Sequence, residues 1–287
     1  MKLVAKTLAG LEDICASELQ EIGAKNIKVH RRAVQFEGDL KVLYAANFNC
    51  RTAISILIEL KKFYAKSAED LYQRVKDYNW NDHMMLDQTF AVHATANSKI
   101  FHHSKFASLK VKDAIADFFR EIYGQRPNVS VDRPDVQIEV HIRDTSVTLL
   151  LNSSGPALFK RGYRQRTGLA PMNECLAAGI LKLAKYRVEE PLIDFCCGSG
   201  TLLFEALLIG KNIAPGLIGR KYGFENWVDF KPKIYEEVKE EAQGRVNSKR
   251  VNIKGYDINR KMITFARHNK ENCEYFEEIR FYTSDLR

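Results

Sequence analysis

The sequence predicts an α/β protein that begins with a ferredoxin-like sandwich and ends in a doubly wound sheet. The first 65 residues show strand and helix patterns in the order β-α-β-β-α-β. A buried strand pattern at 192–195 runs into the glycine turn Gly198-Ser199-Gly200, and a helical pattern follows directly. Two further strand patterns, 251–256 and 279–283, flank a helix, as expected for successive β-α steps of one sheet.

The N-terminal segment supplies each element of the sandwich. Residues 2–8 predict a strand that Gly10 closes, and the helical spacing that follows stops at Gly23. Two short strands, a short helix and a longer strand complete the order, and they are expected at 26–30, 33–36, 40–46 and 53–63. The pattern contains no catalytic constellation.

The middle of the chain predicts a second α+β segment. A helix at 68–78 and a strand at 89–95 precede a polar, basic loop at 97–105. The next helix ends at Gly124, and its expected buried face is Phe106, Leu109, Ala114, Ile115, Phe118, Phe119 and Ile122. Apolar and polar residues alternate over 136–142 and 147–151, so these residues predict a β-hairpin.

The composition of the chain changes after Pro156, where basic residues become frequent. Lys160, Arg161, Arg164 and Arg166 fall within seven residues. Pro171 suits the first turn of a helix that runs to about residue 186 and leads into the strand at 192–195. A charged insertion at 211–250 is expected to hold one helix, around 233–243.

Composition narrows the class of protein. The formal charge of +8 and the pI near 9.1 favour a polyanionic partner, with nucleic acid as the first candidate. The six cysteines include no C-x-x-C pair, so they predict reduced thiols and no metal site. Because the sequence shows no signal-peptide core and no apolar run of membrane-spanning length, we expect a cytoplasmic protein.

Three predicted strands carry an acid at or just beyond their ends, namely Asp194, Asp257 and Asp285. Ligands of doubly wound sheets bind beyond the carboxyl ends of the strands. Ionised carboxylates only accept hydrogen bonds, so three of them suit a ligand with an amine, a ribose diol and an adenine amino group. S-adenosylmethionine has all three groups and a cationic sulfonium as well.

Other nucleotide ligands fit the pattern less well. A dinucleotide fingerprint needs a third glycine where Leu203 stands, and its acid should follow about 20 residues on. Asp257 lies 63 positions after Asp194. Since no lysine follows the glycines, a triphosphate P-loop is excluded. The preferred ligand is therefore S-adenosylmethionine.

Structural alternatives stay open for several of these residues. The glycine turn could be a plain strand–helix corner, and Asp257 or Asp285 could be a helix N-cap. His102 and His103 could be solvated loop residues or phosphate contacts, and the basic cluster at 160–166 could be a solvated linker. Adjacent Cys196 and Cys197 are expected to pack against the cofactor, because no base is placed to activate a thiolate.

The motif at 194–201, Asp-Phe-Cys-Cys-Gly-Ser-Gly-Thr, resembles the Asp-Pro-x-Cys-Gly-Ser-Gly-Thr signature of THUMP-domain RNA methyltransferases, with Phe195 replacing the usual proline. Residues 158–178 are similar to that family's segment between its THUMP and catalytic domains. Residues 98–123 and the hairpin at 136–152 are similar to its THUMP domain. The resemblance spans nearly the whole chain and points to the bacterial 23S ribosomal RNA guanine-N2 methyltransferases, often labelled adenine-N6 DNA methylases.

The resemblance implies three domains: a ferredoxin-like domain at 1–65, an RNA-binding THUMP domain at 66–157, and the first part of a Rossmann-like class I methyltransferase domain at 158–287. Asp194, Gly198 and Gly200 would hold the methionine end of the cofactor, Asp257 the ribose and Asp285 the adenine. The whole expected cofactor set is Asp194, Cys196, Gly198, Ser199, Gly200, Asp257, Ile258 and Asp285. RNA phosphates would be bound by Lys99, His102, His103, Lys105, Lys110, Lys112, Lys160, Arg161, Arg164 and Arg166.

The implied reaction is methyl transfer to the exocyclic N2 of a guanine in 23S ribosomal RNA, with transfer RNA as an alternative substrate. The base would be drawn out of its helix, and the enzyme would orient it for one in-line displacement. The family's Asn/Asp-Pro-Pro-Tyr loop has no match in the 287 residues, so we expect the catalytic residues beyond Arg287 and a truncated chain that is inactive alone. An adenine-N6 DNA methylase and a non-catalytic RNA-binding protein with a vestigial pocket are the alternatives, and the THUMP-like segment favours RNA.

Overall fold

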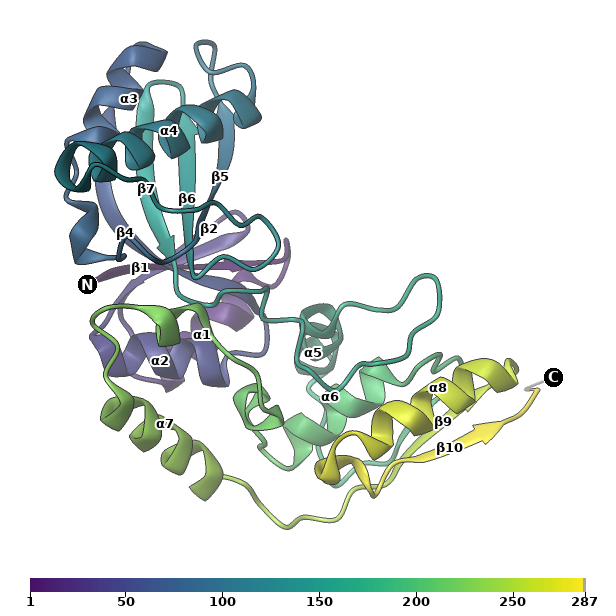
Figure 1. Cartoon of the computed structure of the whole chain (residues 1–287). Helices are drawn as coiled ribbons and strands as arrows, with labels where there is room; N and C mark the ends of the chain where they lie inside the picture. Colours follow the sequence, from purple (N-terminus) through teal and green to yellow (C-terminus); the bar gives the residue numbers. More distant parts are fainter. Residues whose placement is uncertain (286–287) are drawn as a thin grey trace. The chain divides into compact units, whose positions relative to one another are not determined.

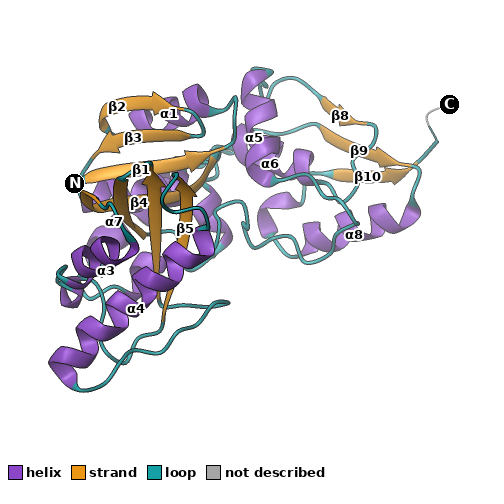
Figure 2. Cartoon of the chain, turned by 90° about the horizontal axis from the view of Figure 1, so that it is seen from above, coloured by secondary structure: helices purple, strands orange, loops and turns teal. Residues whose placement is uncertain are grey.

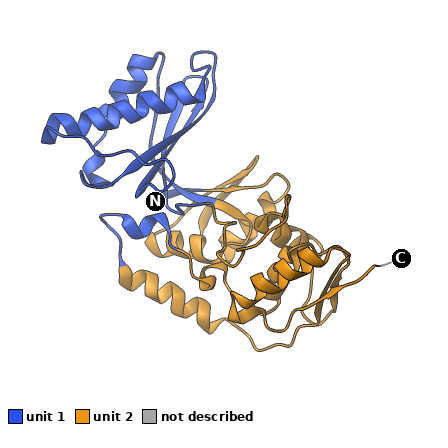
Figure 3. Cartoon of the chain, turned by 45° about the vertical axis from the view of Figure 1, so that its right-hand side comes forward, with its two compact units in different colours: residues 1–4, 55–156, 221–231 blue, residues 5–54, 157–220, 232–287 orange. Residues whose placement is uncertain are grey.

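The computed structural model describes residues 1–285 and resolves the chain into two compact units (Figures 1 and 3). The first unit contains residues 1–4, 55–156 and 221–231, and the second contains 5–54, 157–220 and 232–287. Within the described residues, no helix has both the length and the apolar composition needed to cross a bilayer.

The first unit is built on four adjacent strands in the order β4-β7-β6-β5. Their bounds are β4 (Ala53–Tyr64), β5 (Phe90–Asn97), β6 (Val136–Arg143) and β7 (Ser146–Asn152). β6 and β7 form the predicted hairpin, in which Arg143 pairs with Ser146, and β5 runs parallel to β6. Two helices, α3 (Ala68–Lys76) and α4 (Ser104–Tyr123), pack against each other beside this sheet (Figure 1). The short turns η1 (Trp80–Asp82) and η3 (Gly223–Asn226) complete the unit.

Helix α4 buries a narrower face than the sequence predicts. The buried residues of α4 are Ala107, Val111, Ala114, Ile115, Ala116 and Phe119. Phe106, Leu109 and Ile122 are exposed, so their assignment to the core was wrong. Phe106 and Leu109 lie to the side of the buried stripe, whereas Ile122 is in line with Ile115 and Phe119 but falls in the last turn of the helix.

Most of the ferredoxin-like elements lie in the second unit, and their predicted order is confirmed. They are β1 (Lys2–Thr7), α1 (Glu12–Glu21), β2 (Lys25–His30), β3 (Ala33–Glu37), α2 (Leu40–Asn49) and the start of β4. The strands lie in the order β2-β3-β1-β4. Asp39 begins α2 by accepting a hydrogen bond from the Val42 N–H.

The same unit contains the predicted parallel sheet, with strand order β10-β9-β8 (Figure 2). Its strands are β8 (Leu192–Asp194), β9 (Ile253–Asp257) and β10 (Arg280–Thr283). Helices α5 (Glu174–Leu183), α6 (Thr201–Gly210) and α8 (Arg260–Glu271) accompany it. The insertion contains η2 (Pro215–Ile218) and α7 (Pro232–Gly244), and η4 (Glu274–Phe276) precedes β10.

Apolar packing between α6 and the small sheet fixes the position of the glycine turn. The Phe204 and Phe276 rings stack with their centroids 4.5 Å apart, inside a buried cluster that also includes Leu203 and Phe281. Gly255 in β9 has no room for a side chain, because a Cβ would lie 2.6 Å from Leu203 Cδ1 and 2.9 Å from Cys197 Sγ. This close approach holds the start of α6 directly against the end of β9.

Candidate functional site

The three predicted acids lie at one edge of the small sheet. Asp194 and Asp257 are the last residues of β8 and β9, and Asp285 follows the end of β10 by two residues. β9 pairs in parallel with both neighbours, with Asp194 opposite Gly255 and Thr283 opposite Asp257. The carboxyl ends of the strands therefore meet at the edge where ligands of such sheets bind.

Asp257 holds the glycine turn in place. Its Oδ2 accepts a hydrogen bond from the Gly198 N–H at 2.9 Å, and its Oδ1 accepts one from the Asn259 N–H at 2.8 Å. The N-cap of α8 is Asn259, whose side chain accepts from the Lys261 N–H, so the N-cap alternative for Asp257 does not hold. Each carboxylate oxygen keeps a further lone pair that a ligand hydroxyl can use.

The glycine turn leaves room for a ligand on one side only. Gly198 and Gly200 have φ of +53° and +90°, a region that favours glycine. A Cβ on Gly200 would lie 2.9 Å from the Phe281 ring, whereas a Cβ on Gly198 would meet no described atom within 4 Å. Gly200 is the N-cap of α6, and no side chain among the described residues caps this helix. Its first N–H groups are therefore open to an anionic group of a ligand.

A cavity of about 220 Å³ borders the turn and contains part of the expected cofactor set. Asp194, Cys196, Gly198 and Ser199 line it, and the other lining residues are Gly168, Ala170, Pro171, Met172, Cys197, Thr201, Leu202 and Met262. Gly200, the last residue of the turn, is buried and does not border the cavity. Asp257 does not border it either, but its carboxylate accepts a hydrogen bond from the Gly198 N–H. Ile258 and Asp285 are exposed beyond the strand ends and do not border this cavity.

The cavity favours a cationic or hydrogen-bond-donating ligand. Burial raises the pKa of Asp194, and the nearby charge of Asp257 raises this pKa further. A bound cation would relieve the repulsion between the two carboxylates. Burial, followed by the charges of Asp194 and Asp257, raises the pKa of Cys197 to about 12, so this thiol stays protonated. The described residues contain no cluster of side chains able to hold a metal ion.

Asn269 is a residue of the site that the sequence did not single out. It is fully buried on α8, where its Oδ1 accepts hydrogen bonds from the Gln165 and Arg166 N–H groups at 3.0 and 2.9 Å. Its Nδ2 donates to the carbonyls of Arg166 (2.7 Å) and Ser199 (3.4 Å). The Asn269 side-chain amide therefore links residues 165–166 to the glycine turn. Asn269 follows Ile263 and Ala266 at helical spacing on the buried face of α8, and this spacing is the feature of the sequence that could have indicated its burial.

Arg164 links the same segment to the start of α6 by a hydrogen bond. Its Nη2 donates to Thr201 Oγ1 at 2.8 Å and to the Met172 carbonyl at 2.6 Å, and it lies 3.2 Å from Glu174 Oε1. Burial raises the pKa of Glu174 to about 7, although the Arg164 charge acts in the opposite direction. These contacts all use Nη2, and the side chain of Arg164 is only 15% exposed, so contact of Arg164 with RNA stays a prediction.

The prediction that Arg161 contacts RNA is wrong. Its side chain is 1% exposed and lies 3.4 Å from the carboxylate of Glu205, which is buried in α6. Arg161 also donates to the carbonyls of Leu158 and Arg51. A carboxylate inside an apolar helix needs a counter-ion, and this requirement draws Arg161 inward.

The remaining RNA candidates lie on the surface or near it. Lys99, His102, His103 and Lys105 are exposed at and before the start of α4, and Lys160 and Arg166 are exposed in the other unit. Lys110 lies 5.9 Å from the centre of the Tyr72 ring, and Lys112 pairs with Asp113 at 2.8 Å. Contact of these residues with RNA stays a prediction.

Three segments of the chain match models of known families. They are an RlmL ferredoxin-like domain at 2–57, a THUMP domain at 65–152 and an RMKL-like methyltransferase domain at 161–287. The ribosomal RNA large subunit methyltransferase K/L of Buchnera aphidicola subsp. Schizaphis graminum is 37% identical over 292 residues. This match covers 99% of the chain but only 42% of that curated relative.

Two solved structures are similar over almost the whole chain. The crystal structure of SMU.472 complexed with S-adenosylhomocysteine has a TM-score of 0.89 and 29% identity, and the match covers 99% of this chain and 75% of that one. A predicted N6-adenine-specific DNA methylase from Listeria monocytogenes has a TM-score of 0.88 and 32% identity, and its match covers 99% and 74% of the two chains.

Proposed function

This chain belongs to the family of THUMP-containing methyltransferases with an RMKL-like catalytic domain, and we propose that it binds S-adenosylmethionine and serves methyl transfer to RNA. The observation that carries the proposal is the glycine turn that Asp257 holds to the end of β9, beside the cavity bordered by Asp194. The complex of SMU.472 with S-adenosylhomocysteine supports the choice of cofactor. The domain bounds 1–65, 66–157 and 158–287 are part of the proposal.

The residues at the cavity fit this cofactor. Asp194 offers carboxylate oxygens to the methionine ammonium, and the open N–H groups at the start of α6 suit the methionine carboxylate. The remaining lone pairs of Asp257 can accept from ribose hydroxyls, with Ile258 and Asp285 next along the same edge for the adenine. When bound, the cofactor supplies a methyl group on a cationic sulfonium, and the charges of Asp194 and Asp257 favour that cation.

The residues of this chain bind the cofactor and orient its methyl group. Asn269 and Arg164 hold the segment 164–172 against the glycine turn, so one wall of the cavity is fixed before the ligand arrives. Preorganisation of this kind lowers the entropy cost of placing a methyl group in line with its acceptor. The protonated Cys197 thiol serves as an apolar surface next to the turn.

The proposed partner is RNA, and the proposed target is the N2 of a guanine in large-subunit ribosomal RNA. The net charge of +8, the THUMP segment and the exposed basic residues near the start of α4 support an RNA partner. The relative from Buchnera supports ribosomal RNA, and this partner agrees with a cytoplasmic location. The Listeria relative favours a second candidate, methylation of adenine N6.

Separate measurements of binding and transfer test the proposal. Calorimetry with S-adenosylhomocysteine should show one site per chain, and 23S ribosomal RNA should bind more tightly than duplex DNA of equal length. A folded chain that binds no S-adenosylhomocysteine would refute the cofactor proposal, and equal affinity for the two polymers would refute the choice of RNA. We expect no transfer by the 287 residues alone, since they contain no Asn/Asp-Pro-Pro-Tyr tetrapeptide; methylated RNA in that assay would refute this point.

A further inference from the structure

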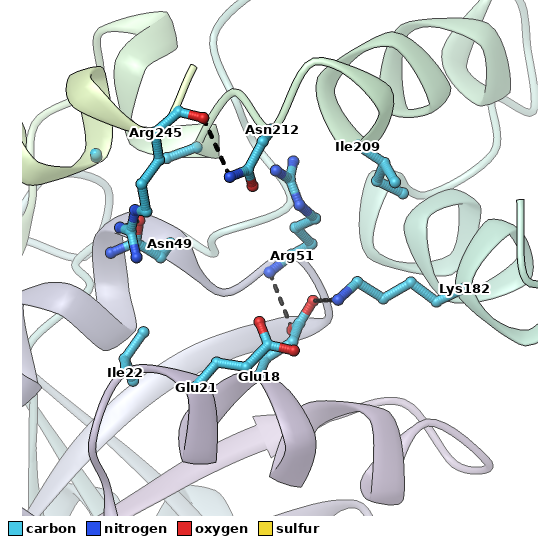
Figure 4. A pocket seen from close by; sticks show the side chains of 11 residues that line it. Glu18, Glu21, Ile22, Asn49, Arg51, Lys182, Ile209, Asn212 and Arg245 are labelled. Carbon is cyan, nitrogen blue, oxygen red and sulfur yellow. Dashed lines mark hydrogen bonds and ion pairs between the residues drawn. The ribbon is translucent and has the colours of Figure 1, made fainter. Parts of the chain in front are cut away.

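A second cavity in the same compact unit shares no lining residue with the candidate cofactor cavity. It has a volume of about 140 Å³ and is bordered by residues from five segments of the chain, at 18–22, 49–51, 182, 209–214 and 242–245 (Figure 4). The charged or polar side chains that matter for its chemistry are Glu18, Glu21, Arg51, Lys182, Asn212 and Arg245. Glu21, Asn212 and Arg245 are exposed, so a solute can enter from the solvent.

Arg51 is buried in this cavity without a counter-ion in contact. Only 7% of the residue is exposed, and its Nη1 has no hydrogen-bond partner among residues 1–285. Figure 4 shows its side chain extending into the cavity, with the guanidinium on the side where Asn212 is drawn. A buried cation without a partner is costly, and this cost falls when an anion binds beside it.

The neighbouring carboxylates of Glu18 and Glu205 contact other groups than the Arg51 guanidinium. Glu18 Oε2 accepts from the N–H groups of Arg51 and Thr52 and from the Thr52 hydroxyl, while its Oε1 lies 3.1 Å from Lys182 Nζ. Glu205 is bound by Arg161 and by the Tyr163 hydroxyl. The charges of Glu205, Glu18 and Glu21 act on Arg51 from nearby, but among the described residues none of these carboxylates forms an ion pair with its guanidinium.

Two further cations border the same space. Arg245 donates from Nη2 to Asn49 Oδ1 at 2.7 Å, and Lys182 has two N–H bonds beyond its contact with Glu18. Arg51, Lys182 and Arg245 place three cationic groups at the border of one cavity, and such a set favours a multiply charged oxyanion over a single carboxylate. Glu21 is the opposing charge, and it lies at the exposed border of the cavity.

We propose that this cavity binds a phosphate group, with Arg51 as the main ligand and Lys182 and Arg245 beside it. The volume suits one phosphate with accompanying water. Free inorganic phosphate and a backbone phosphate of RNA share this chemistry. The site does not depend on methyl transfer or on the cofactor, so it can be tested separately from the proposed function.

The first test measures thermal unfolding and calorimetry of the 287-residue chain in sodium phosphate against sodium chloride of equal ionic strength. Phosphate should raise the midpoint of unfolding of the wild-type chain, since it binds the folded state. Arg51→Met should lose this rise, and phosphate affinity should fall about tenfold with the loss of a charge-assisted contact. Arg187→Met, which removes an exposed arginine away from the cavity, should keep the rise.

Two milder variants keep the proposal testable if Arg51→Met does not fold. Glu21→Gln removes the opposing charge and should strengthen phosphate binding about two- to fivefold, whereas Arg245→Gln should weaken it by a similar factor. A wild-type midpoint that responds equally to phosphate and chloride would overturn the proposal. An equal phosphate response in Arg51→Met, or equal affinities in Glu21→Gln and Arg245→Gln, would also overturn it.

A second arm identifies the source of the phosphate group. If the group belongs to RNA, Arg51→Met should weaken binding of a ribosomal RNA hairpin more than Arg187→Met does, and inorganic phosphate should compete with that RNA. If it is free phosphate, the two variants should bind RNA equally while only Arg51→Met loses the phosphate response. Each of these results supports a phosphate site and assigns its source.

Discussion

The carboxylate of Asp257 accepts a hydrogen bond from the backbone N–H of Gly198 at 2.9 Å. This contact joins the end of β9 to the turn that follows β8, so one acid positions the loop beside which a cofactor is proposed to bind. The same carboxylate also accepts from Asn259, the N-cap of α8. Asp257 therefore orders two loops at the edge of the sheet, whether or not a ligand is bound.

Replacement of Asp257 should separate this ordering role from direct ligand contact. Asp257→Ala removes both, and we expect S-adenosylhomocysteine affinity to fall by about 1–3 kcal/mol. Asp257→Asn keeps an oxygen that can accept from Gly198 but loses the charge, so its loss should be smaller. Calorimetry on both variants measures the difference, with Asp132→Ala as the control because Asp132 is exposed in the other unit. Unchanged affinity in Asp257→Ala would remove this residue from the site.

The features predicted best from the sequence are those with local causes. The glycine turn, the strands on either side of it and the acids at their ends follow from short patterns of apolar residues and glycine. Parallel pairing of β8, β9 and β10 then brings Asp194 and Asp257 to one edge, as expected. Side-chain partners far apart in the sequence leave no such pattern, and Asn269 bonds a segment more than 100 positions away.

Asn269→Ala should loosen the segment 165–166 from the glycine turn. The part-buried N–H groups of Gln165 and Arg166 would lose their partner, so we expect a loss of stability of about 1–3 kcal/mol in urea unfolding. S-adenosylhomocysteine affinity should fall as well, because this segment leads into one wall of the cofactor cavity. Asn272→Ala, an exposed asparagine just after the same helix, is the matched control. Equal ligand affinity in the two variants would contradict the link between Asn269 and the cavity.

The basic cluster shows why charge alone did not separate a surface residue from a buried one. Arg161 and Arg166 look equivalent in the sequence, but Glu205 in α6 pairs with Arg161 and with no other arginine within salt-bridge distance among the described residues. The signal for this partner was a single acid in an otherwise apolar helix. Such an acid predicts a buried counter-ion, although it does not tell which of several arginines will supply it.

Arg161→Met and Arg166→Met should therefore have opposite consequences. Loss of Arg161 leaves Glu205 buried without its ion pair, so unfolding in urea should show a loss of about 3–5 kcal/mol. The double change Arg161→Met with Glu205→Leu should recover much of that loss. Arg166 is exposed, so Arg166→Met should keep the stability of the protein and instead weaken RNA binding and reduce its salt dependence. A stable Arg161→Met chain with weakened RNA binding would reverse this assignment.

Glu174 provides a prediction for the dependence of stability on pH. Burial raises its pKa from 4.5 to about 7, so the folded chain binds a proton that the unfolded chain has already released between these two values. Stability contributed by this group is complete below pH 4.5 and is lost as the pH rises through about 7. Glu174→Gln cannot release a proton, so its stability relative to the wild-type chain should increase from pH 5 to pH 8. Urea unfolding at several pH values measures this change, and Glu190→Gln, at an exposed position, should show no comparable trend. Parallel stability profiles for Glu174→Gln and the wild-type chain would mean that Arg164 keeps Glu174 ionised throughout this range.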